Sequence, residues 1–244
     1  MENLKKILLL NFFIPLLLPI GTPKLFAQSS TSIPIEEWFD YKVGQQNLDI
    51  NNGKLLLNYD KILNKVDRFY FREYQSGTVI YDNQVYYNLI LNYDLLNDDL
   101  ILKPSGESDK NPIILNKSKV KSYSINQKNY INLSYGNSTL PEFINGFYEE
   151  NFKESKIIYY IKHVKNKKNL INDSNLYDDF ISNRYYFIFY KNTYHEISSR
   201  KDVIEILPEY KKIINEYYSN NSNEKSDKSK FLKDLIFYLN TIIK

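Results

Sequence analysis

The chain has 244 residues, a formal net charge of +3 and no cysteine. This near balance of charges argues against a nucleic-acid-binding protein, because such proteins gather a basic excess on one face. The lack of cysteine excludes disulfide bonds and thiolate metal sites, so an ordinary hydrophobic core must hold the fold. The 23 tyrosines and 14 phenylalanines, against seven glycines, favour pleated and half-buried strands.

The first 27 residues have the pattern of an export signal. Lys5 and Lys6 precede an apolar run from residue 7 to residue 20, and Ala27 is the small residue that a cleavage site requires. The run is shorter than a membrane-spanning helix needs, and no second long apolar run follows. We therefore predict no transmembrane span in the mature chain. Removal of residues 1–27 takes away three lysines and one glutamate, which lowers the formal charge from +3 to +1.

Residues 28–66 form an N-terminal segment for which the sequence leaves the structure open. Trp38 and its aromatic neighbours fit the start of a short helix after Pro34, whereas residues 54–59 fit a strand or a helix equally well. Residues 67–198 show a period-two pattern and turn signals at regular spacing, which predict an antiparallel β domain. The predicted strands are Arg68–Tyr74, Thr78–Tyr81, Asn88–Leu95, Leu100–Leu102, Ile113–Asn116, Val120–Asn126, Tyr130–Ser134, Lys156–Val164 and Arg184–Tyr190.

These strands predict a mainly β, α+β fold whose centre is a curved antiparallel sheet, a meander of about 8–11 strands. Arg184–Tyr190 is apolar or aromatic on both faces, so we expect it to be central and covered on both sides. The tyrosines alternate as sheet packing requires, although tyrosine rings can also stack on sugars.

The segment Asn97 to Asp99 separates two predicted strands. Side chains of this type bond their own backbone and tolerate left-handed conformations, so the segment predicts a hairpin turn. A calcium site is the alternative, but the alternating ligand spacing of a calcium-binding loop is missing. We therefore predict that Asp98 and Asp99 are solvated turn residues without a metal or catalytic role.

The period of the pattern changes at residue 199 and predicts a pair of C-terminal helices over residues 199–244. Ser199 and Asp202 fit a helix-capping pattern, and Pro208 is expected to kink or split the first helix. After a polar stretch, apolar residues recur at helical spacing from Phe231 onward and predict a second, amphipathic helix. Because an apolar stripe needs a surface to cover, we expect these helices to pack on the sheet.

No motif with a specific catalytic or phosphate-binding chemistry is present, since GxSxG, HExxH, GxGxxG and the P-loop are all missing. His163 and His195 are the only histidines, and neither stands in a zinc-binding pattern. Ser105 lies in a predicted turn and not on the tight elbow of a nucleophile. The sequence therefore predicts no catalytic, cofactor-binding or metal-binding residue, and no cofactor.

Carboxylates are the only potentially catalytic side chains that are plentiful in this sequence. Neighbours such as Asp98 and Asp99 point to opposite faces of a strand, so a glycan-active enzyme would have to unite carboxylates from distant segments. The candidates for this alternative are Asp94, Asp98, Glu149 and Asp179. A carrier of a hydrophobic ligand is a further alternative, which would need an apolar cavity between sheet and helices. The basic run Lys162–Lys168 is predicted to be a solvated loop, with an anionic glycan or lipid headgroup as its alternative partner.

Four stretches of the chain carry a family resemblance. They are GTVIYDNQVYYNLILNYDLLNDDLIL from Gly77 to Leu102, ILNKSKVKSYSINQKNYINL from Ile114 to Leu133, NGFYEENF from Asn145 to Phe152 and KDVIEILPEYKKIINEYYSNN from Lys201 to Asn221. These stretches resemble a family of exported proteins of unassigned function from Bacteroidetes-type bacteria. The matching positions are Tyr86, Tyr93, Asp94, Gly146, Phe147 and Tyr148. The resemblance implies a periplasmic or outer-membrane-associated location and brings no catalytic residue.

The export signal and the lack of catalytic motifs favour a non-enzymatic cell-envelope protein that acts as a binding or accessory module. Its expected partner is an envelope protein, a glycan or a lipid, and not a nucleic acid.

Overall fold

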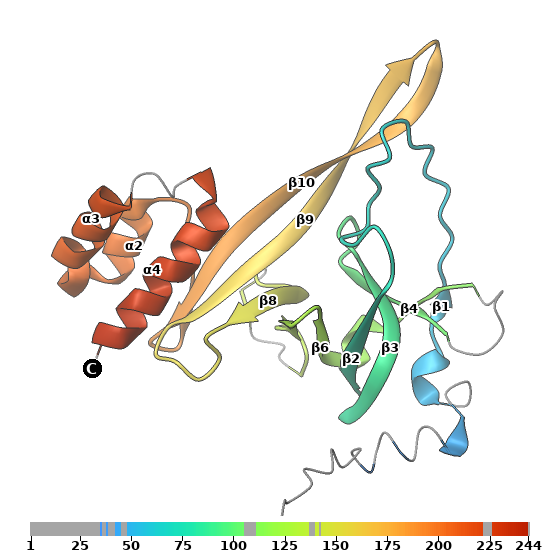
Figure 1. Ribbon diagram of the computed structural model, residues 1–244, viewed down its shortest axis with the longest axis horizontal. Coiled ribbons are helices and arrows are strands. Elements are labelled where there is room, and N and C mark those ends of the chain that lie inside the picture. Colours follow the sequence, from blue (N-terminus) through green and yellow to red (C-terminus); the bar gives the residue numbers. More distant parts are fainter. Residues whose placement is uncertain are drawn as a thin grey trace, which may run out of the picture. The chain divides into compact units, whose positions relative to one another are not determined.

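The structure is a computed structural model that describes Ile35, Trp38 and residues 42–44, 48–104, 111–136, 140–141, 143–221 and 226–243. The predicted export signal, residues 1–27, and Ser105 lie outside the described residues. An antiparallel sheet of eleven strands and three C-terminal helices make up most of the described part (Figure 1). The predicted mainly β, α+β fold is therefore confirmed. No helix in the described ranges is both long enough and apolar enough to cross a membrane.

The strands range from two residues in β1 and β5 to 15 and 16 residues in β9 and β10. They are β1 (Lys54–Leu55), β2 (Gln75–Tyr81), β3 (Gln84–Asp94), β4 (Asp99–Lys103), β5 (Ile113–Ile114), β6 (Val120–Ile125), β7 (Lys128–Asn132), β8 (Phe147–Asn151), β9 (Ile158–Asn172), β10 (Asn175–Tyr190) and β11 (Thr193–Glu196). Their order in the sheet is β1-β5-β4-β3-β2-β6-β7-β8-β9-β10-β11. The strands β6 to β11 follow the predicted meander. The strands β2 to β5 also pair in sequence order, and the departures from a single meander are the pairing of β6 with β2 and of β1 with β5.

The predicted hairpin within residues 88–102 is confirmed, because β3 pairs with β4 through a tight turn. Asp98 lies in the turn as predicted, but its side chain is only 22% exposed and is not solvated as expected; Asp99, also predicted to be a turn residue, is the first residue of β4. The Asp98 carboxylate accepts hydrogen bonds from the Tyr93 hydroxyl, from Lys162 Nζ at 2.7 Å and from the backbone N–H of Phe147 at 3.3 Å. The turn thus docks onto β8 and β9, a tertiary contact that local turn chemistry does not reveal.

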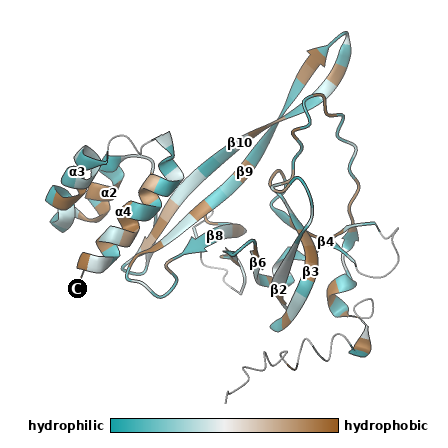
Figure 2. Cartoon of the chain, in the orientation of Figure 1, coloured by the Kyte–Doolittle hydropathy of each residue, from teal (hydrophilic) through white to brown (hydrophobic). Residues whose placement is uncertain are grey.

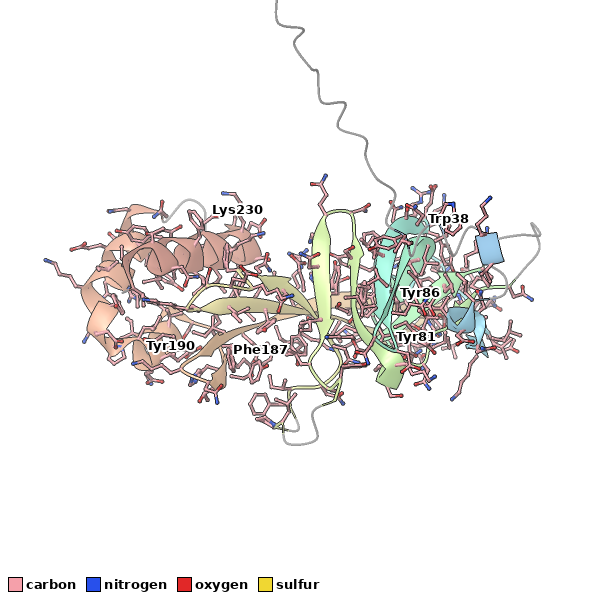
Figure 3. The ribbon with its side chains drawn as sticks, turned by 90° about the horizontal axis from the view of Figure 1, so that it is seen from below. Trp38, Tyr81, Tyr86, Phe187, Tyr190 and Lys230 are labelled. Atoms are coloured by element: carbon pink, nitrogen blue, oxygen red, sulfur yellow. The ribbon has the colours of Figure 1, made fainter. Side chains whose placement is uncertain are left out.

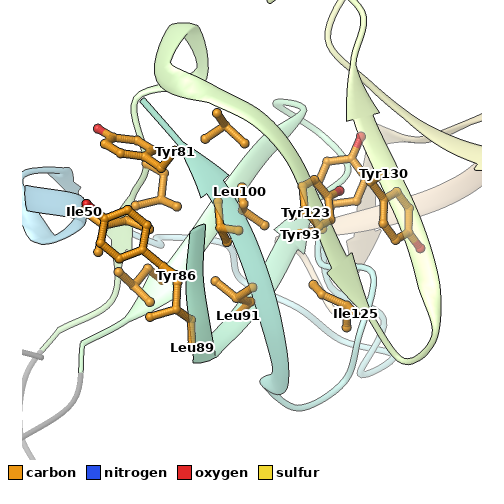
Figure 4. Close-up of a cluster of buried hydrophobic side chains, with 14 of the residues drawn as sticks. Ile50, Tyr81, Tyr86, Leu89, Leu91, Tyr93, Leu100, Tyr123, Ile125 and Tyr130 are labelled. Atoms are coloured by element: carbon orange, nitrogen blue, oxygen red, sulfur yellow. The ribbon is translucent and has the colours of Figure 1, made fainter. Parts of the chain in front are cut away.

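The first hydrophobic core is formed by one face of the strands from β4 across to β7 (Figure 4). Strict alternation would put Tyr86 and Leu89 on opposite faces, yet both are buried in this core. The register between β2 and β3 shifts near Gly77, and Asn88 has a φ of 54°, so a bulge brings both side chains to the same face. Tyrosines serve this core as packing groups, since the rings of Tyr123 and Tyr130 stack with centroids 4.6 Å apart.

The C-terminal helices are α2 (Arg200–Ile206), α3 (Lys211–Asn220) and α4 (Lys228–Ile242), three instead of the expected pair. The predicted capping pattern is confirmed, because Ser199 and Asp202 form a capping box at the start of α2. Pro208 splits the first predicted helix into α2 and α3, with a short 3-10 turn between them. The helices and one face of β9 and β10 form a second core around Tyr159, Ile188 and Leu235.

The long hairpin of β9 and β10 corrects two expectations. Lys162–Lys168, predicted to be a loop, lies inside β9, which pairs with β10 from Ile158 to Asn172. The end of Arg184–Tyr190 is covered on both faces, as predicted. Tyr186 lies in the second core, and Phe187 lies in a third core on the other face. It is next to the edge of the sheet and not central. Figure 2 shows that the far half of this hairpin carries mainly polar residues, which weakens the apolar pattern that marks a strand.

The predicted strand Arg68–Tyr74 is reduced to an isolated bridge between Phe69 and Asp94. The N–H of Tyr70 donates to Tyr93 O at 2.8 Å, and the N–H of Leu95 donates to Arg68 O at 3.0 Å. The segment therefore follows the end of β3 only briefly. Tyr70 in this segment contacts β9, because the centroid of its ring lies 4.8 Å from the ring centroid of His163.

Candidate functional site

A pocket of about 300 Å³ opens beside β7, β8, β9 and β10, at the first turns of α4. Figure 3 shows Lys230 at this end of α4. The pocket is lined by Tyr70, Lys128, Glu149, Ile161, His163, Arg184, Asp227, Ser229, Lys230 and Lys233. Six of these residues carry a formal charge at neutral pH, so the lining is rich in charged groups.

Strand register brings the sheet residues of this pocket to one face. Glu149 lies directly opposite Ile161 in the β8–β9 pair, and Arg184 lies opposite His163 in the β9–β10 pair. Directly opposed residues share a face, as do residues two apart in one strand. Glu149, Ile161, His163 and Arg184 therefore point to the same side of the sheet, the side that α4 covers.

A buried carboxylate, Glu149, forms the floor of the pocket together with His163. Glu149 Oε2 lies 2.8 Å from His163 Nε2 and accepts a hydrogen bond from Lys128 Nζ at 2.9 Å. The side chains of Glu149 and His163 are only 6% and 5% exposed. Burial by itself would raise the pKa of Glu149, but the hydrogen bonds from His163 and Lys128 outweigh it and lower the pKa to about 2.

His163 is neutral near pH 7, because burial lowers its pKa against the opposing attraction of Glu149. Since Glu149 is ionised, the neutral imidazole carries its hydrogen on Nε2, and this N–H donates a hydrogen bond to the carboxylate. Glu149 is therefore anionic near neutral pH, and its carboxylate already accepts hydrogen bonds from two donors. It is poorly suited to act as a general acid near neutral pH.

The pocket has an excess of positive charge. Lys128, Arg184, Lys230 and Lys233 are cationic, whereas Glu149 and Asp227 are the two acids in the lining. Both acids have partners within the protein, because Asp227 caps α4 by accepting the backbone N–H of Lys230 at 3.2 Å. The positive end of the α4 dipole adds to the same potential. The arrangement suits an anion of modest size, such as a phosphate or a carboxylate.

Of the four carboxylates considered for a glycan-active enzyme, only Glu149 lines this pocket. Asp94 is fully buried and pairs with Arg68. Asp98 pairs with Lys162, and Asp179 accepts a hydrogen bond from Asn64 on the far part of β10. Each of the four thus has its own partners in the fold.

Sequence reasoning missed most of the pocket. Tyr70, Lys128, Arg184 and the residues of α4 come from distant segments, and no motif joins them. His163 falls within the predicted strand Lys156–Val164, and that placement is confirmed, since it lies in β9. His195 lies in β11 and does not line this pocket. Cross-strand pairing was the only signal that could have united Glu149 with His163, and one sequence does not provide it.

The described residues contain no group of three or more His, Cys, Asp or Glu side chains able to hold a metal ion. A larger pocket, of about 530 Å³, lies at β5 and is lined by Asn52, Gly53, Lys54, Asp99, Ile114, Leu115, Asn116 and Lys117. Lys54, Asp99 and Lys117 bring charged groups to its lining, whereas a carrier of a hydrophobic ligand would need an apolar cavity between sheet and helices.

Replacing Glu149 with glutamine is expected to make stability less dependent on acid pH. The pKa of Glu149 falls from 4.5 to about 2 on folding, so its stabilising effect is present above pH 4.5 and is lost as the pH falls through 2. We expect Glu149→Gln to lower the free energy of unfolding by up to about 3 kcal/mol at pH 7 and by progressively less toward pH 2.

Urea denaturation at pH 7, 4.5 and 3 measures this difference. Glu205→Gln is the control, because Glu205 forms an exposed pair with Lys201 on α2. A stability loss in Glu149→Gln that is the same at all three pH values would contradict the assignment of this ionised carboxylate.

Comparisons with protein-family models, with curated proteins and with solved structures give no match for this chain.

Proposed function

We propose that the protein is an exported, non-enzymatic binding module of the cell envelope, and that the pocket at α4 binds an anionic group of its ligand. The observation that carries the proposal is that two cations of the lining, Arg184 and Lys233, have no ion pair among the described residues, whereas Lys128 is paired with Glu149 and Lys230 with Asp234. The export-signal pattern at residues 1–27 and the resemblance to exported envelope proteins support the location.

The side chains of the pocket suit recognition of phosphate or carboxylate. Arg184 presents a planar guanidinium, which can hold two oxygens at once. Lys233 adds a point charge from α4, whereas the charge of Lys128 on β7 is already paired with Glu149 at 2.9 Å. Envelope glycans, lipid headgroups and acidic protein segments all carry such groups, so the shared chemistry is that of the anion.

The ionisation state of the pocket supports binding over acid–base catalysis. Glu149 has a pKa of about 2 and is held by His163 and Lys128, so it does not exchange a proton near neutral pH. Its physical role is to orient Lys128 and His163 beneath the bound anion.

A phosphate titration tests this function directly. Inorganic phosphate is added to the full chain at constant ionic strength while the backbone amide NMR shifts of β8, β9 and α4 are followed. We expect saturable shifts around the pocket, and an affinity at least about tenfold weaker in the Arg184→Gln/Lys233→Gln variant, because each lost charged hydrogen bond costs about 1.5–3 kcal/mol.

The matched control is Lys201→Gln/Lys212→Gln, which makes the same change in net charge outside the pocket. Both of these lysines are largely exposed, at 82% and 89%. If the control loses as much affinity as the pocket variant, the binding is unspecific charge attraction. If the pocket variant binds phosphate as well as the natural chain, the proposed site is wrong.

A further inference from the structure

The outer edge of β10 has an open stretch between two covered stretches. At one end β11 pairs with Phe187 to Tyr190, and the N–H of Ile197 donates to Tyr186 O at 2.8 Å. At the other end the N–H of Asp178 donates to Lys61 O at 2.7 Å. Between them, Phe180, Ser182 and Arg184 have no partner strand on this side within the described residues. Figure 1 shows β10 extending well past β8.

The direction of the backbone groups follows from the register. β9 and β10 pair without a shift from Asn175 to Phe189, so every second residue of β10 turns its N–H and C=O away from β9. Asp178 and Tyr186 both do so, as their outward hydrogen bonds show. Residues 180, 182 and 184 have the same parity and therefore present three outward N–H groups and three outward C=O groups.

This edge already accepts an extended segment of the chain itself. Ile62 forms a parallel bridge with Asp178, and the backbone N–H of Lys61 donates to Asp178 Oδ2 at 3.0 Å. Asn64 adds a side-chain hydrogen bond to Asp179 at 2.5 Å. The geometry of β10 is thus compatible with the addition of a strand immediately beyond the open stretch.

The side chains beside the open stretch differ between the two faces. Arg184 lies on the face of the anion pocket, opposite His163. On the other face Ile181 and Tyr185 are 37% and 44% exposed. A strand paired here would meet a cation on one face and apolar groups on the other, and its side chains alternate between these faces with a period of two.

We propose that residues 180–184 of β10 bind an extended segment of a partner protein in which acidic and apolar residues alternate. One acidic side chain meets Arg184 at the rim of the anion pocket, and the alternate apolar side chains rest on Ile181 and Tyr185. The proposal rests on the anion-binding function of the pocket and names the class of partner that carries the anion. Charge complementarity at Arg184 and the open backbone groups select this occupant.

Ser182→Pro tests the edge with little change elsewhere. The N–H of Ser182 points away from β9, so proline removes an outward donor without breaking the β9–β10 ladder. Ser182→Ala is the control, because it keeps the N–H. The probe is a labelled seven-residue peptide of alternating glutamate and valine, with a lysine–valine peptide as the charge-reversed probe, and binding is followed by fluorescence anisotropy.

We expect the glutamate–valine peptide to bind the natural chain and Ser182→Ala equally, and to bind Ser182→Pro at least about tenfold more weakly. Phosphate affinity should be the same in all three. Equal binding to Ser182→Pro and Ser182→Ala, or equal binding of the lysine–valine peptide, would overturn the proposal.

Phosphate separates failure of this proposal from failure of the proposed function. If the natural chain binds phosphate but not the glutamate–valine peptide, the proposed strand partner is refuted and the proposed anion-binding function of the pocket is retained. A natural chain that binds neither refutes both. If Ser182→Pro does not fold, hydrogen exchange on the natural chain decides, because the peptide must slow exchange of the N–H groups of Phe180, Ser182 and Arg184. Unchanged exchange there would overturn the proposal.

Discussion

Deletion of residues 226–244 is expected to yield a protein that aggregates or binds a hydrophobic dye. This segment contains α4, which buries Phe231, Leu232, Leu235, Ile236 and Leu239 in the second core. Each such side chain contributes about 1.5–3 kcal/mol of transfer free energy, and its loss leaves the opposing face of β9 and β10 in water. Size-exclusion chromatography, dye fluorescence and thermal unfolding of the shortened chain measure the effect.

A point substitution on the same helix gives a graded version of this experiment. Leu235→Ala removes a side chain with 0% exposure and is expected to lower the free energy of unfolding by about 2–5 kcal/mol. Phe237→Ala is the control on the outer face, where Phe237 is 59% exposed, and should cost less than about 1 kcal/mol. A soluble, monomeric deletion variant with an unchanged melting temperature would show that α4 does not hold the sheet.

Arg68→Met is expected to lower the free energy of unfolding by about 3–5 kcal/mol, because it leaves the carboxylate of Asp94 buried without its cation. Asp94 is 0% exposed, and Arg68 Nε donates to its Oδ2 at 2.7 Å. The other oxygen accepts the backbone N–H groups of Leu96 and Asn97, so the carboxylate cannot turn toward water without opening the β3–β4 turn. Urea denaturation at pH 7 measures the loss.

Lys119→Met is the matched control for Arg68→Met. Lys119 pairs with Asp82 at 3.0 Å, but both side chains are well exposed, at 46% and 62%. Pairs of this kind contribute less than about 1 kcal/mol, since water screens them and the long side chain loses entropy. Equal stability losses in Arg68→Met and Lys119→Met would mean that the buried pair is no stronger than a surface pair.

Local signals in the sequence were sufficient where one segment determines its own structure. The turn around Asp98, the capping box of Ser199 and the break at Pro208 all depend on residues within a few positions of each other. The apolar spacing of α4 likewise identified a helix from one stretch of chain. Such features need no knowledge of distant partners.

Features that depend on a distant partner were missed or misjudged. The lysines of Lys162–Lys168 lie in β9 because β10 provides the backbone hydrogen-bonding partners of this strand. The far half of the β9–β10 hairpin is exposed, so its side chains do not need to form an apolar face. The pairing of β6 with β2 also departs from the expected meander. A period of two tells which residues share a face, but not which strands lie side by side.

The sequence by itself determined the mainly β class, most of the strands, a kink or break at Pro208 and the apolar stripe of α4, because each of these depends on local residue spacing. Only the tertiary structure placed Lys128, Glu149, His163 and Arg184 on neighbouring strands around one pocket. It also decided that Asp98 anchors its turn to Lys162 instead of facing water. Burial and ion pairing depend on strand order and register, which bring together side chains far apart in the chain.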